Sequence, residues 1–280
     1  MPGLDVDTKD RTLVMSTASH RRSQNAVERR SIWRPLWVPL SLLGFWALLS
    51  HFELVNAYLI PSPGAVAEDA VLLLRSGELV RHLWVSIRRV FLGYAVTVCT
   101  ALPLALLLHE RPRWAERLAL PLSFLRVTPP LALIPILILW LGLGEPSKIA
   151  VIVLASFFPV FVNAFDGLER VEGRWRELSR SLELYFSEHL RFVLLPGALP
   201  HIVSGLRIGF GYAWRALIGA ELFAAASGLG YLIIDSQEMA RTDRVVVGIL
   251  AIGITGMLFD VLFNAGTRRF FPWVDGGQSK

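Results

Sequence analysis

Six long apolar runs alternate with polar segments along the chain, at about residues 33–52, 84–108, 118–141, 148–168, 205–226 and 244–266. A helix needs roughly 20 apolar residues to cross about 30 Å of hydrocarbon, and each run is close to or above that length. The pattern therefore predicts an all-α, polytopic membrane protein with six transmembrane helices.

Prolines interrupt the third predicted span, which contains Pro129, Pro130 and Pro135. Proline has no backbone N–H and clashes with the preceding helical turn, so a run of prolines kinks or ends a helix. A break at membrane depth is tolerated where protein or water satisfies the freed backbone groups. We therefore expect a kink or a break in this span.

The segment between the first two spans, "PSPGAVAEDAVLLLRSGELVRH" (61–82), predicts a turn followed by a short amphipathic helix from about Ala65 to Arg75. Two interpretations stay open for this helix. It forms a surface for an extracytoplasmic partner, or it lies on the membrane surface.

Composition supports the membrane assignment, because 54% of residues are hydrophobic, 18% are charged and the mean hydropathy is +0.51. A soluble protein carries about 25% charged residues. The net charge of +5 comes from Lys and Arg beside the spans, which favours a role in topology over nucleic-acid binding. With a cytoplasmic N-terminus, inside segments carry 18 Lys and Arg and outside segments 7. Both termini are therefore predicted to be cytoplasmic.

These assignments divide the chain into four parts. They are an N-terminal tail (1–32), a first transmembrane helix with its outer turn (33–60), a core domain (61–273) and a C-terminal tail (274–280). Within the core, residues 169–204 are predicted to form a cytoplasmic segment.

Sequence motifs for catalysis or nucleotide binding do not occur in the chain. The segment "GLGEPSK" (142–148) lacks the Gly-Lys pair of a phosphate-binding loop, and neither HExxH nor GxSxG occurs. Cys99 is the single cysteine, and the six histidines have no spacing typical of metal ligands. We expect no catalytic centre, no metal and no cofactor bound by this chain.

The fifth predicted span carries glycines and charges. Gly205 and Gly209 are four residues apart, which favours close contact between helices. Arg215 and Glu221 lie in the same span, and Arg126 precedes the prolines of the third. A charge at mid-membrane costs about 2.5–3.5 kcal/mol on insertion scales, so such residues usually face a polar path or a partner. Two hypotheses stay open for these three: a translocation path or a structural pairing.

A polar stretch, "RELSRSLELYFSEHLRFVLLPGALP" (176–200), separates two apolar blocks. On a helix, Leu178, Leu182, Tyr185 and Phe186 form an apolar stripe. Such a cytoplasmic helix suits either a groove on a soluble partner or packing on its own bundle.

Ordered landmarks from about Pro61 to Trp273 support a family resemblance: "LIPSPGAV", "HLWVSIRRVFLGY", "TPPLALIPILILWLGLGEPSKI", "FFPVFVNAFDGL", "LPGALPHIVSGLRIGFGYAWRALIGAEL", "SGLGYLIIDSQEMARTDRVVVGI" and "RRFFPW". With these landmarks the chain resembles the permease subunits of binding-protein-dependent ABC importers, in the branch that handles nitrate, aliphatic sulfonates and taurine.

The resemblance implies a type I importer bundle in the bacterial inner membrane and an import function without enzymatic activity of its own. It further implies a dimer of the chain, a cytoplasmic ABC ATPase subunit that binds ATP, and a periplasmic or lipid-anchored substrate-binding protein. Substrate would pass between the two copies, along spans three to five. The residues "FFPVFVN" and "RALI" favour organosulfonates slightly over nitrate or taurine.

The ATPase-coupling motif of such permeases is Glu-Ala-Ala, three residues, Gly, nine residues, Ile, one residue, Leu-Pro. The corresponding positions here are Glu177, Leu178, Ser179, Glu183, Val193, Leu195 and Pro196. Glu183 replaces the glycine that normally permits a turn between two short helices. We expect the turn to be reshaped or the helix to continue through it, because a left-handed glutamate would cost roughly 1–2 kcal/mol.

Two other classes of function have less support in the sequence. A secondary transporter driven by an ion gradient would favour inverted repeats and mid-span acids, and only Glu221 and Asp260 qualify as such acids. A membrane enzyme would need a clustered catalytic set, which the sequence lacks.

Overall fold

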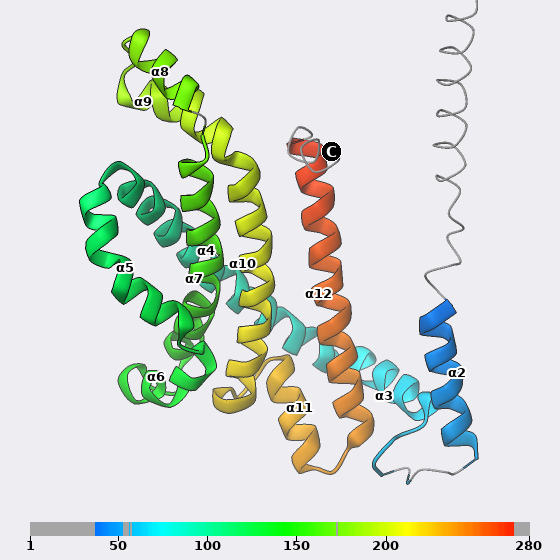
Figure 1. The fold of residues 1–280 in the computed structure, drawn as a ribbon. Coiled ribbons are helices and arrows are strands. Elements are labelled where there is room, and N and C mark those ends of the chain that lie inside the picture. Colours follow the sequence, from blue (N-terminus) through cyan, green and yellow to red (C-terminus); the bar gives the residue numbers. More distant parts are fainter. Residues whose placement is uncertain (1–36, 53–55, 57, 172, 272–280) are drawn as a thin grey trace, which may run out of the picture. The chain divides into compact units, whose positions relative to one another are not determined.

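The computed structural model describes residues 37–52, 56, 58–171 and 173–271 (Figure 1). The chain divides into two units, residues 1–63 and 64–280, which are described separately. The predicted N-terminal tail, residues 33–36 of the first predicted span and the predicted C-terminal tail lie outside the described residues.

The first unit contains one apolar helix, α2 (Trp37–His51, 15 residues). The helix confirms the helical prediction over these residues, and at 1.5 Å per residue it is about 22 Å long. That length is below the 30 Å of a typical hydrocarbon core. Trp46 anchors the end of the unit, because its Nε1 donates a hydrogen bond to the carbonyl of Pro61 at 3.0 Å.

The described residues of the second unit form helices joined by short turns, without strands. Its elements are α3 (Pro63–Arg75), α4 (Glu78–Glu110), α5 (Pro112–Val127), η2 (Pro130–Leu133), α6 (Ile134–Leu141), α7 (Glu145–Glu169), α8 (Gly173–Ser181), α9 (Phe186–His189), the π-helical turn η3 (Leu190–Leu194), α10 (Leu195–Ala224), α11 (Leu229–Glu238) and α12 (Thr242–Phe270).

Four stretches are long and apolar enough to cross a membrane: α4, α7, the stretch Phe186–Glu238 that contains α10, and α12 up to Arg269. They confirm the predicted spans 84–108, 148–168, 205–226 and 244–266. A bundle of this kind agrees with the predicted all-α fold class.

The third predicted span is not one continuous helix. Instead α5 and the η2–α6 stretch (Pro130–Leu141) meet at 88°, so the expected break is confirmed, and the pair forms either a broken span or a re-entrant loop. Thr128 precedes Pro129, and a residue before proline is disfavoured in the helical region. Thr128 accordingly has extended backbone angles (φ −69°, ψ 123°), which end α5.

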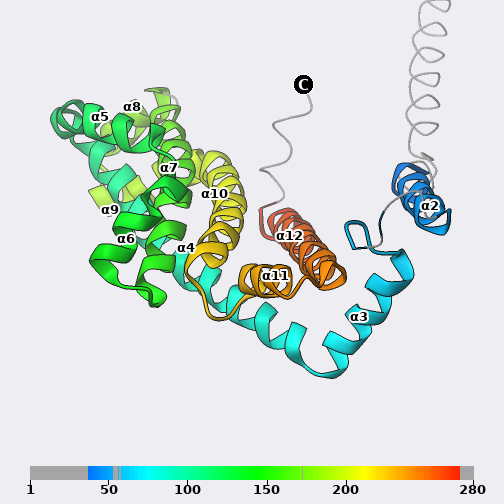
Figure 2. The same ribbon diagram turned by 90° about the horizontal axis from the view of Figure 1, so that it is seen from below.

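The core of the second unit lies where α7 packs against both α4 and α10 (Figure 2). Val160, Ala101 and Ala198 are fully buried in this core. A Cβ on Gly205 would lie 2.6 Å from the Cβ of Asn163, and one on Gly209 would lie 2.5 Å from a methyl group of Val160. The predicted helix contact at these glycines is therefore confirmed: only glycine lets α10 approach α7 this closely.

Helix α3 confirms the amphipathic helix predicted from Ala65 to Arg75. The carboxylate of Asp69 is buried on its inner face and accepts hydrogen bonds from Arg241 at 2.7 Å and Arg244 at 3.4 Å. These contacts attach α3 to the start of α12, while Val71 and Leu72 remain exposed on its outer face.

Candidate functional site

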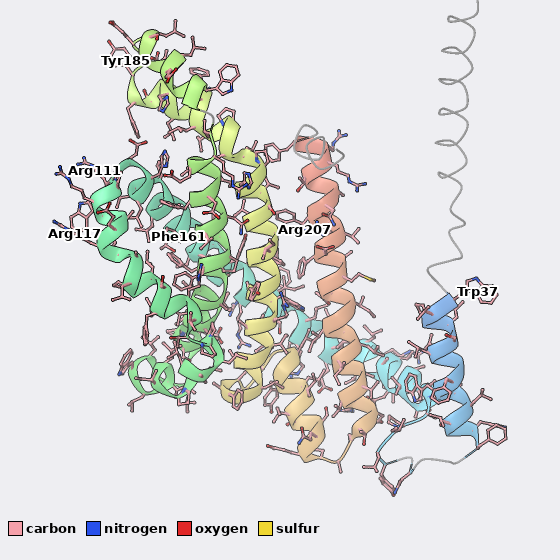
Figure 3. The ribbon with its side chains drawn as sticks, viewed as in Figure 1. Trp37, Arg111, Arg117, Phe161, Tyr185 and Arg207 are labelled. Carbon is pink, nitrogen blue, oxygen red and sulfur yellow. The ribbon has the colours of Figure 1, made fainter. Side chains whose placement is uncertain are left out.

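The coupling segment (169–204) joins α7 to α10 at one end of the second unit, opposite the end that holds α6 and α11 (Figure 1). Its short helices α8 and α9 extend beyond the bundle, with Tyr185 at their tip (Figure 3). We call α8, α9 and the turn between them (173–189) the knob.

Glu183 makes the turn between the two helices of the knob. Helix α8 ends at Ser181, and Glu183 has a φ of 48°, in the left-handed region that favours glycine. The N–H of Leu184 then bonds back to the carbonyl of Ser179 at 3.2 Å. The expectation that the turn is reshaped or the helix continues is therefore wrong. Glutamate adopts the glycine conformation, at a cost of about 1–2 kcal/mol.

Side-chain hydrogen bonds help to hold the knob together. Ser179, which is buried, lies 2.7 Å from Nδ1 of His189 and links α8 to α9. The carboxylate of Glu188 accepts a hydrogen bond from the N–H of Tyr185 at 2.9 Å and caps the first turn of α9. These contacts offset part of the strain at Glu183.

Four large apolar side chains of the knob remain about half or more exposed to solvent. Leu178, Leu182, Tyr185 and Phe186 are 48%, 62%, 78% and 56% exposed. They come from α8, the turn and α9. The prediction that they form a stripe on one continuous helix is therefore wrong, because two short helices and a turn carry them. Packing on the chain's own bundle, the second interpretation of this segment, covers these side chains only in part.

The end of the coupling motif leads into α10. Val193 is half-buried and Leu195 and Pro196 are exposed, whereas Leu194 between them is fully buried and anchors the segment. Pro196 has no N–H to donate, and the preceding turn is π-helical, with the N–H of Leu195 bonded to the carbonyl of Leu190. Glu177, the first motif residue, is exposed on α8.

A polar cavity of 590 Å³ lies beneath the knob, lined by His109, Glu110, Pro112, Glu169, Ser179, Leu184, Phe186 and His189. Nδ1 of His109 is 2.8 Å from the carboxylate of Glu169, which connects the end of α4 to the end of α7. The sequence alone does not single out His109 and His189, because their partners lie in other helices.

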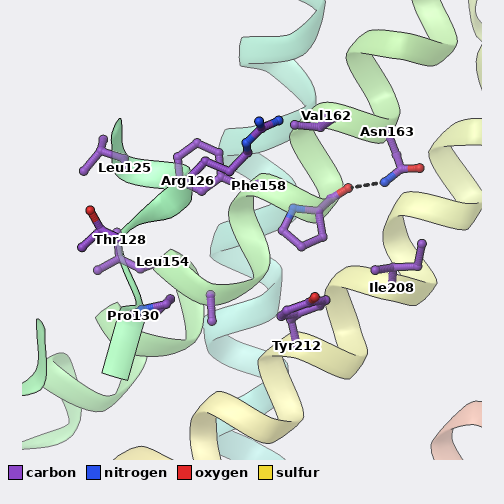
Figure 4. Close-up of a pocket in the computed structure, with 12 residues that line it drawn as sticks. Leu125, Arg126, Thr128, Pro130, Leu154, Phe158, Val162, Asn163, Ile208 and Tyr212 are labelled. Atoms are coloured by element: carbon purple, nitrogen blue, oxygen red, sulfur yellow. Dashed lines mark hydrogen bonds between the residues drawn. The ribbon is translucent and has the colours of Figure 1, made fainter. Parts of the chain in front are cut away.

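Arg126 lines a second cavity, of 350 Å³, between α5, η2, α7 and α10 (Figure 4). Its other lining residues are Leu125, Thr128, Pro130, Leu154, Ala155, Phe158, Pro159, Val162, Asn163, Ile208 and Tyr212. We call this space the Arg126 cavity.

Arg215 lies next to the Arg126 cavity without lining it. Its Nε donates a hydrogen bond to the carbonyl of Gly211 at 3.0 Å, and its guanidinium lies 4.6 Å from the centre of the Tyr212 ring. Tyr212 is itself part of the cavity wall. The structure thus brings two of the three predicted path residues to one region of the bundle.

Glu221 lies elsewhere, in a buried polar cluster. Its carboxylate accepts hydrogen bonds from Arg89 at 2.8 Å, from Ser86 at 2.8 and 2.9 Å, and from the N–H of Gly230 at 3.0 Å, and only 1% of the residue is exposed. Of the two hypotheses for Glu221, the structure favours the structural pairing.

Arg89 connects this cluster to a second carboxylate. Its guanidinium bonds to Glu145 at 2.6 and 2.8 Å and also donates to the carbonyl of Ser227. Helices α4, α7 and α10 are thereby joined near one end. Arg89 and Glu145 could not be singled out from the sequence, because they lie near the ends of apolar runs and resemble ordinary flanking charges.

Gly228 completes the buried cluster. Its φ is 119°, and a Cβ at this position would overlap the carboxylate of Glu221. Its N–H donates to Nδ1 of His82 at 3.0 Å. A residue with a side chain would therefore disturb both the turn and the ion pair.

Comparisons with known proteins show which family the chain belongs to. The profile of the family described as "Binding-protein-dependent transport system inner membrane component" matches residues 101–276. SsuC of Bacillus subtilis (strain 168), whose name refers to aliphatic sulfonate transport, is 33% identical over 262 residues, 94% of this chain and 95% of that protein. TauC of Escherichia coli (strain K12), a taurine transport system permease, is 35% identical over 83% of this chain and 86% of its own length.

Two further relatives extend the comparison. The nitrate import permease NrtB of Synechocystis sp. (strain ATCC 27184 / PCC 6803 / Kazusa) is 30% identical over 81% of this chain and 85% of its own length. A chain of the MetNI methionine ABC transporter, solved in inward-facing conformations, shares the fold with a TM-score of 0.54 and 19% identity, over 67% of this chain and 95% of that chain. The chain belongs to the family of inner membrane components of binding-protein-dependent transport systems.

Proposed function

We propose that the chain is the membrane-spanning subunit of an ATP-driven importer for aliphatic sulfonates or a related small anion. The names of the matching relatives support this substrate class, because they refer to aliphatic sulfonate, taurine and nitrate transport. Arg126, an exposed cation beside a cavity near the middle of the bundle, is consistent with an anionic substrate.

The proposal of an ATPase partner rests on the exposed apolar face of the knob. Leu178, Leu182, Tyr185 and Phe186 are exposed on the knob, whose helices α8 and α9 extend beyond the end of the bundle (Figure 1). A soluble groove that takes up these side chains removes their apolar area from water, which is favourable by about 25 cal/mol per Å². We place this face in the cytoplasm, with both termini on the same side.

Helix α10 provides a direct mechanical connection from the knob to the opposite end of the bundle. It runs 30 residues from Leu195, which follows the coupling segment, to Ala224 beyond Glu221. A helix of that length spans about 45 Å. When ATP draws two knobs together, α10 moves the buried cluster and the bundle alternates between inward-open and outward-open states.

Two copies of the chain, two ATPase subunits and a substrate-binding protein complete the proposed importer. Substrate passes between the copies along the face that carries the Arg126 cavity. The binding protein delivers the anion from the outer side and supplies most of the selectivity.

The positions of Glu221 and Asp260 do not support a secondary transporter driven by an ion gradient. Both candidates are paired in the structure: Glu221 with Arg89 at 2.8 Å and Asp260 with Arg207 at 2.9 Å. Each carboxylate is therefore already engaged by an arginine.

Reconstitution into proteoliposomes tests the proposal. The chain, its ATPase partner and its binding protein should together accumulate labelled ethanesulfonate only when ATP is supplied to the ATPase side. Accumulation without ATP, driven by an imposed ion gradient, would contradict the proposal.

A further inference from the structure

The Arg126 cavity lies near the middle of the bundle. Phe158 and Tyr212 line it from the central turns of α7 and α10, and Thr128 and Pro130 line it from the break between α5 and α6. Figure 4 shows side chains from α5, η2, α7 and α10 around one space. Its volume of 350 Å³ falls within the range of small-molecule sites.

Arg126 is the one charged residue among the twelve that line the cavity. Within the part of the chain that the structure describes, no hydrogen bond or ion pair joins its guanidinium to another residue. Arg89 and Arg207 differ from it, because each binds a carboxylate at 2.8–2.9 Å. A cation held at membrane depth without a protein partner needs water or an anion beside it.

The rest of the wall combines a few polar groups with a larger apolar surface. Asn163 uses one amide hydrogen on the carbonyl of Pro159 at 2.8 Å, which leaves its second hydrogen and its oxygen for other partners. Tyr212 adds a hydroxyl group, and Leu154, Phe158 and Ile208 add apolar surface. No carboxylate lines the cavity to repel an anion.

We propose that the Arg126 cavity binds an organic anion with a short aliphatic tail. The anionic head pairs with the guanidinium of Arg126 and hydrogen-bonds to Asn163, and the tail packs on Leu154, Phe158 and Ile208. A bare inorganic anion would leave that apolar surface against water, so the cavity favours an alkanesulfonate over nitrate. This inference deepens the proposed function and rests on it.

The binding test uses the full chain in lipid nanodiscs, without the binding protein, and labelled hexanesulfonate as the probe. Charge-assisted hydrogen bonds contribute roughly 1.5–3 kcal/mol, which corresponds to about a tenfold to hundredfold change in affinity. Arg126→Gln should weaken hexanesulfonate binding by about tenfold or more, and Arg126→Lys should lose less. Methanesulfonate and nitrate should compete less well than hexanesulfonate.

Arg117→Gln provides the matched control, since Arg117 lies on the same helix but outside the cavity wall, 5.8 Å from the centre of the Trp114 ring. Figure 3 shows Arg117 on the outer side of α5. This variant should bind hexanesulfonate as the wild type does. Leu154→Trp, which fills the apolar part of the cavity and keeps Arg126, should weaken hexanesulfonate more than methanesulfonate.

The inference is overturned if the wild type does not bind hexanesulfonate saturably, or if Arg126→Gln binds it with unchanged affinity. Equal affinity for hexanesulfonate and methanesulfonate would overturn the role of the apolar wall. The same chain is assayed for ATP-driven import with its partners. If the chain imports substrate but shows no binding in the cavity, only this inference is wrong. If no ATP-driven import occurs, the proposed function is wrong.

Discussion

Arg89 and Glu221 form a buried ion pair, Nη1 to Oε1 at 2.8 Å, with side chains 3% and 0% exposed. The pair joins α4 to α10, and Arg89 also binds Glu145 of α7 at 2.6 Å. One guanidinium thus connects three helices at the end of the bundle opposite the knob. The consequences can be tested by removing each partner in turn.

Arg89→Ala should be strongly destabilising, because it leaves the carboxylate of Glu221 buried without its cation. Breaking a buried pair in this way costs about 3–5 kcal/mol. Glu145→Gln should cost clearly less, since 43% of the Glu145 side chain is exposed. Thermal unfolding in nanodiscs measures both. Arg88→Ala removes the same charge from an exposed neighbouring position and serves as the control.

Replacement of both partners by apolar residues offers a sharper test of the same pair. Arg89→Met combined with Glu221→Met should be more stable than either single variant, because no unpaired charge then remains buried. Additive losses in the double variant would show that the two side chains do not act as a pair.

Gly228→Ala should lower stability, because the residue has a φ of 119° and a new Cβ would meet the carboxylate of Glu221. Gly253→Ala is the matched control, since nothing lies within 4 Å of a Cβ at that helical position. The control should be neutral or slightly stabilising, in line with the helix propensity of alanine. Equal melting temperatures for both variants would argue against the cluster geometry.

Glu183→Gly should preserve the knob and relieve its backbone strain, with a gain of up to about 1 kcal/mol. Glu183→Val should disrupt the turn, since a β-branched residue at positive φ is strongly disfavoured. Hydrogen exchange over residues 173–189 reports on both. Faster exchange in the glycine variant than in the valine variant would refute the left-handed turn.

Tyr185→Asp combined with Phe186→Asp should abolish co-purification with the ATPase partner, because two charges replace 78% and 56% exposed apolar side chains of the knob. Membrane insertion should be unaffected. Tyr185→Leu combined with Phe186→Leu keeps the surface apolar and should retain the partner. Stoichiometric recovery of the ATPase with the aspartate variant would exclude the knob as its docking site.

The long helices could be predicted from the sequence because run length alone indicates a membrane span. The break before Pro129 could be predicted too, since proline excludes helical geometry locally. The turn at Glu183 could not, because Leu178, Leu182, Tyr185 and Phe186 fit one helix by periodicity and a left-handed glutamate is uncommon.

The buried cluster around Arg89 and Glu221 could not be predicted from the sequence, for a different reason. Arg89 finds Glu145 and Glu221 at sequence separations of 56 and 132 residues, and only the packing of three helices brings them together. Arg126 and Arg215 were predicted as charges at membrane depth. Their proximity to one cavity depends on the angle at which α5 ends, which the sequence does not specify.

Uptake into proteoliposomes tests the central claim most directly. The claim is that a partner subunit hydrolyses ATP, and that its docking on the knob couples this hydrolysis to import. With the ATPase and the binding protein present and ionophores collapsing every ion gradient, wild-type chains should still accumulate labelled ethanesulfonate when ATP is supplied. The Tyr185→Asp, Phe186→Asp variant should not accumulate it. Uptake that stops with the ionophores, or that continues unchanged in the variant, would contradict the account.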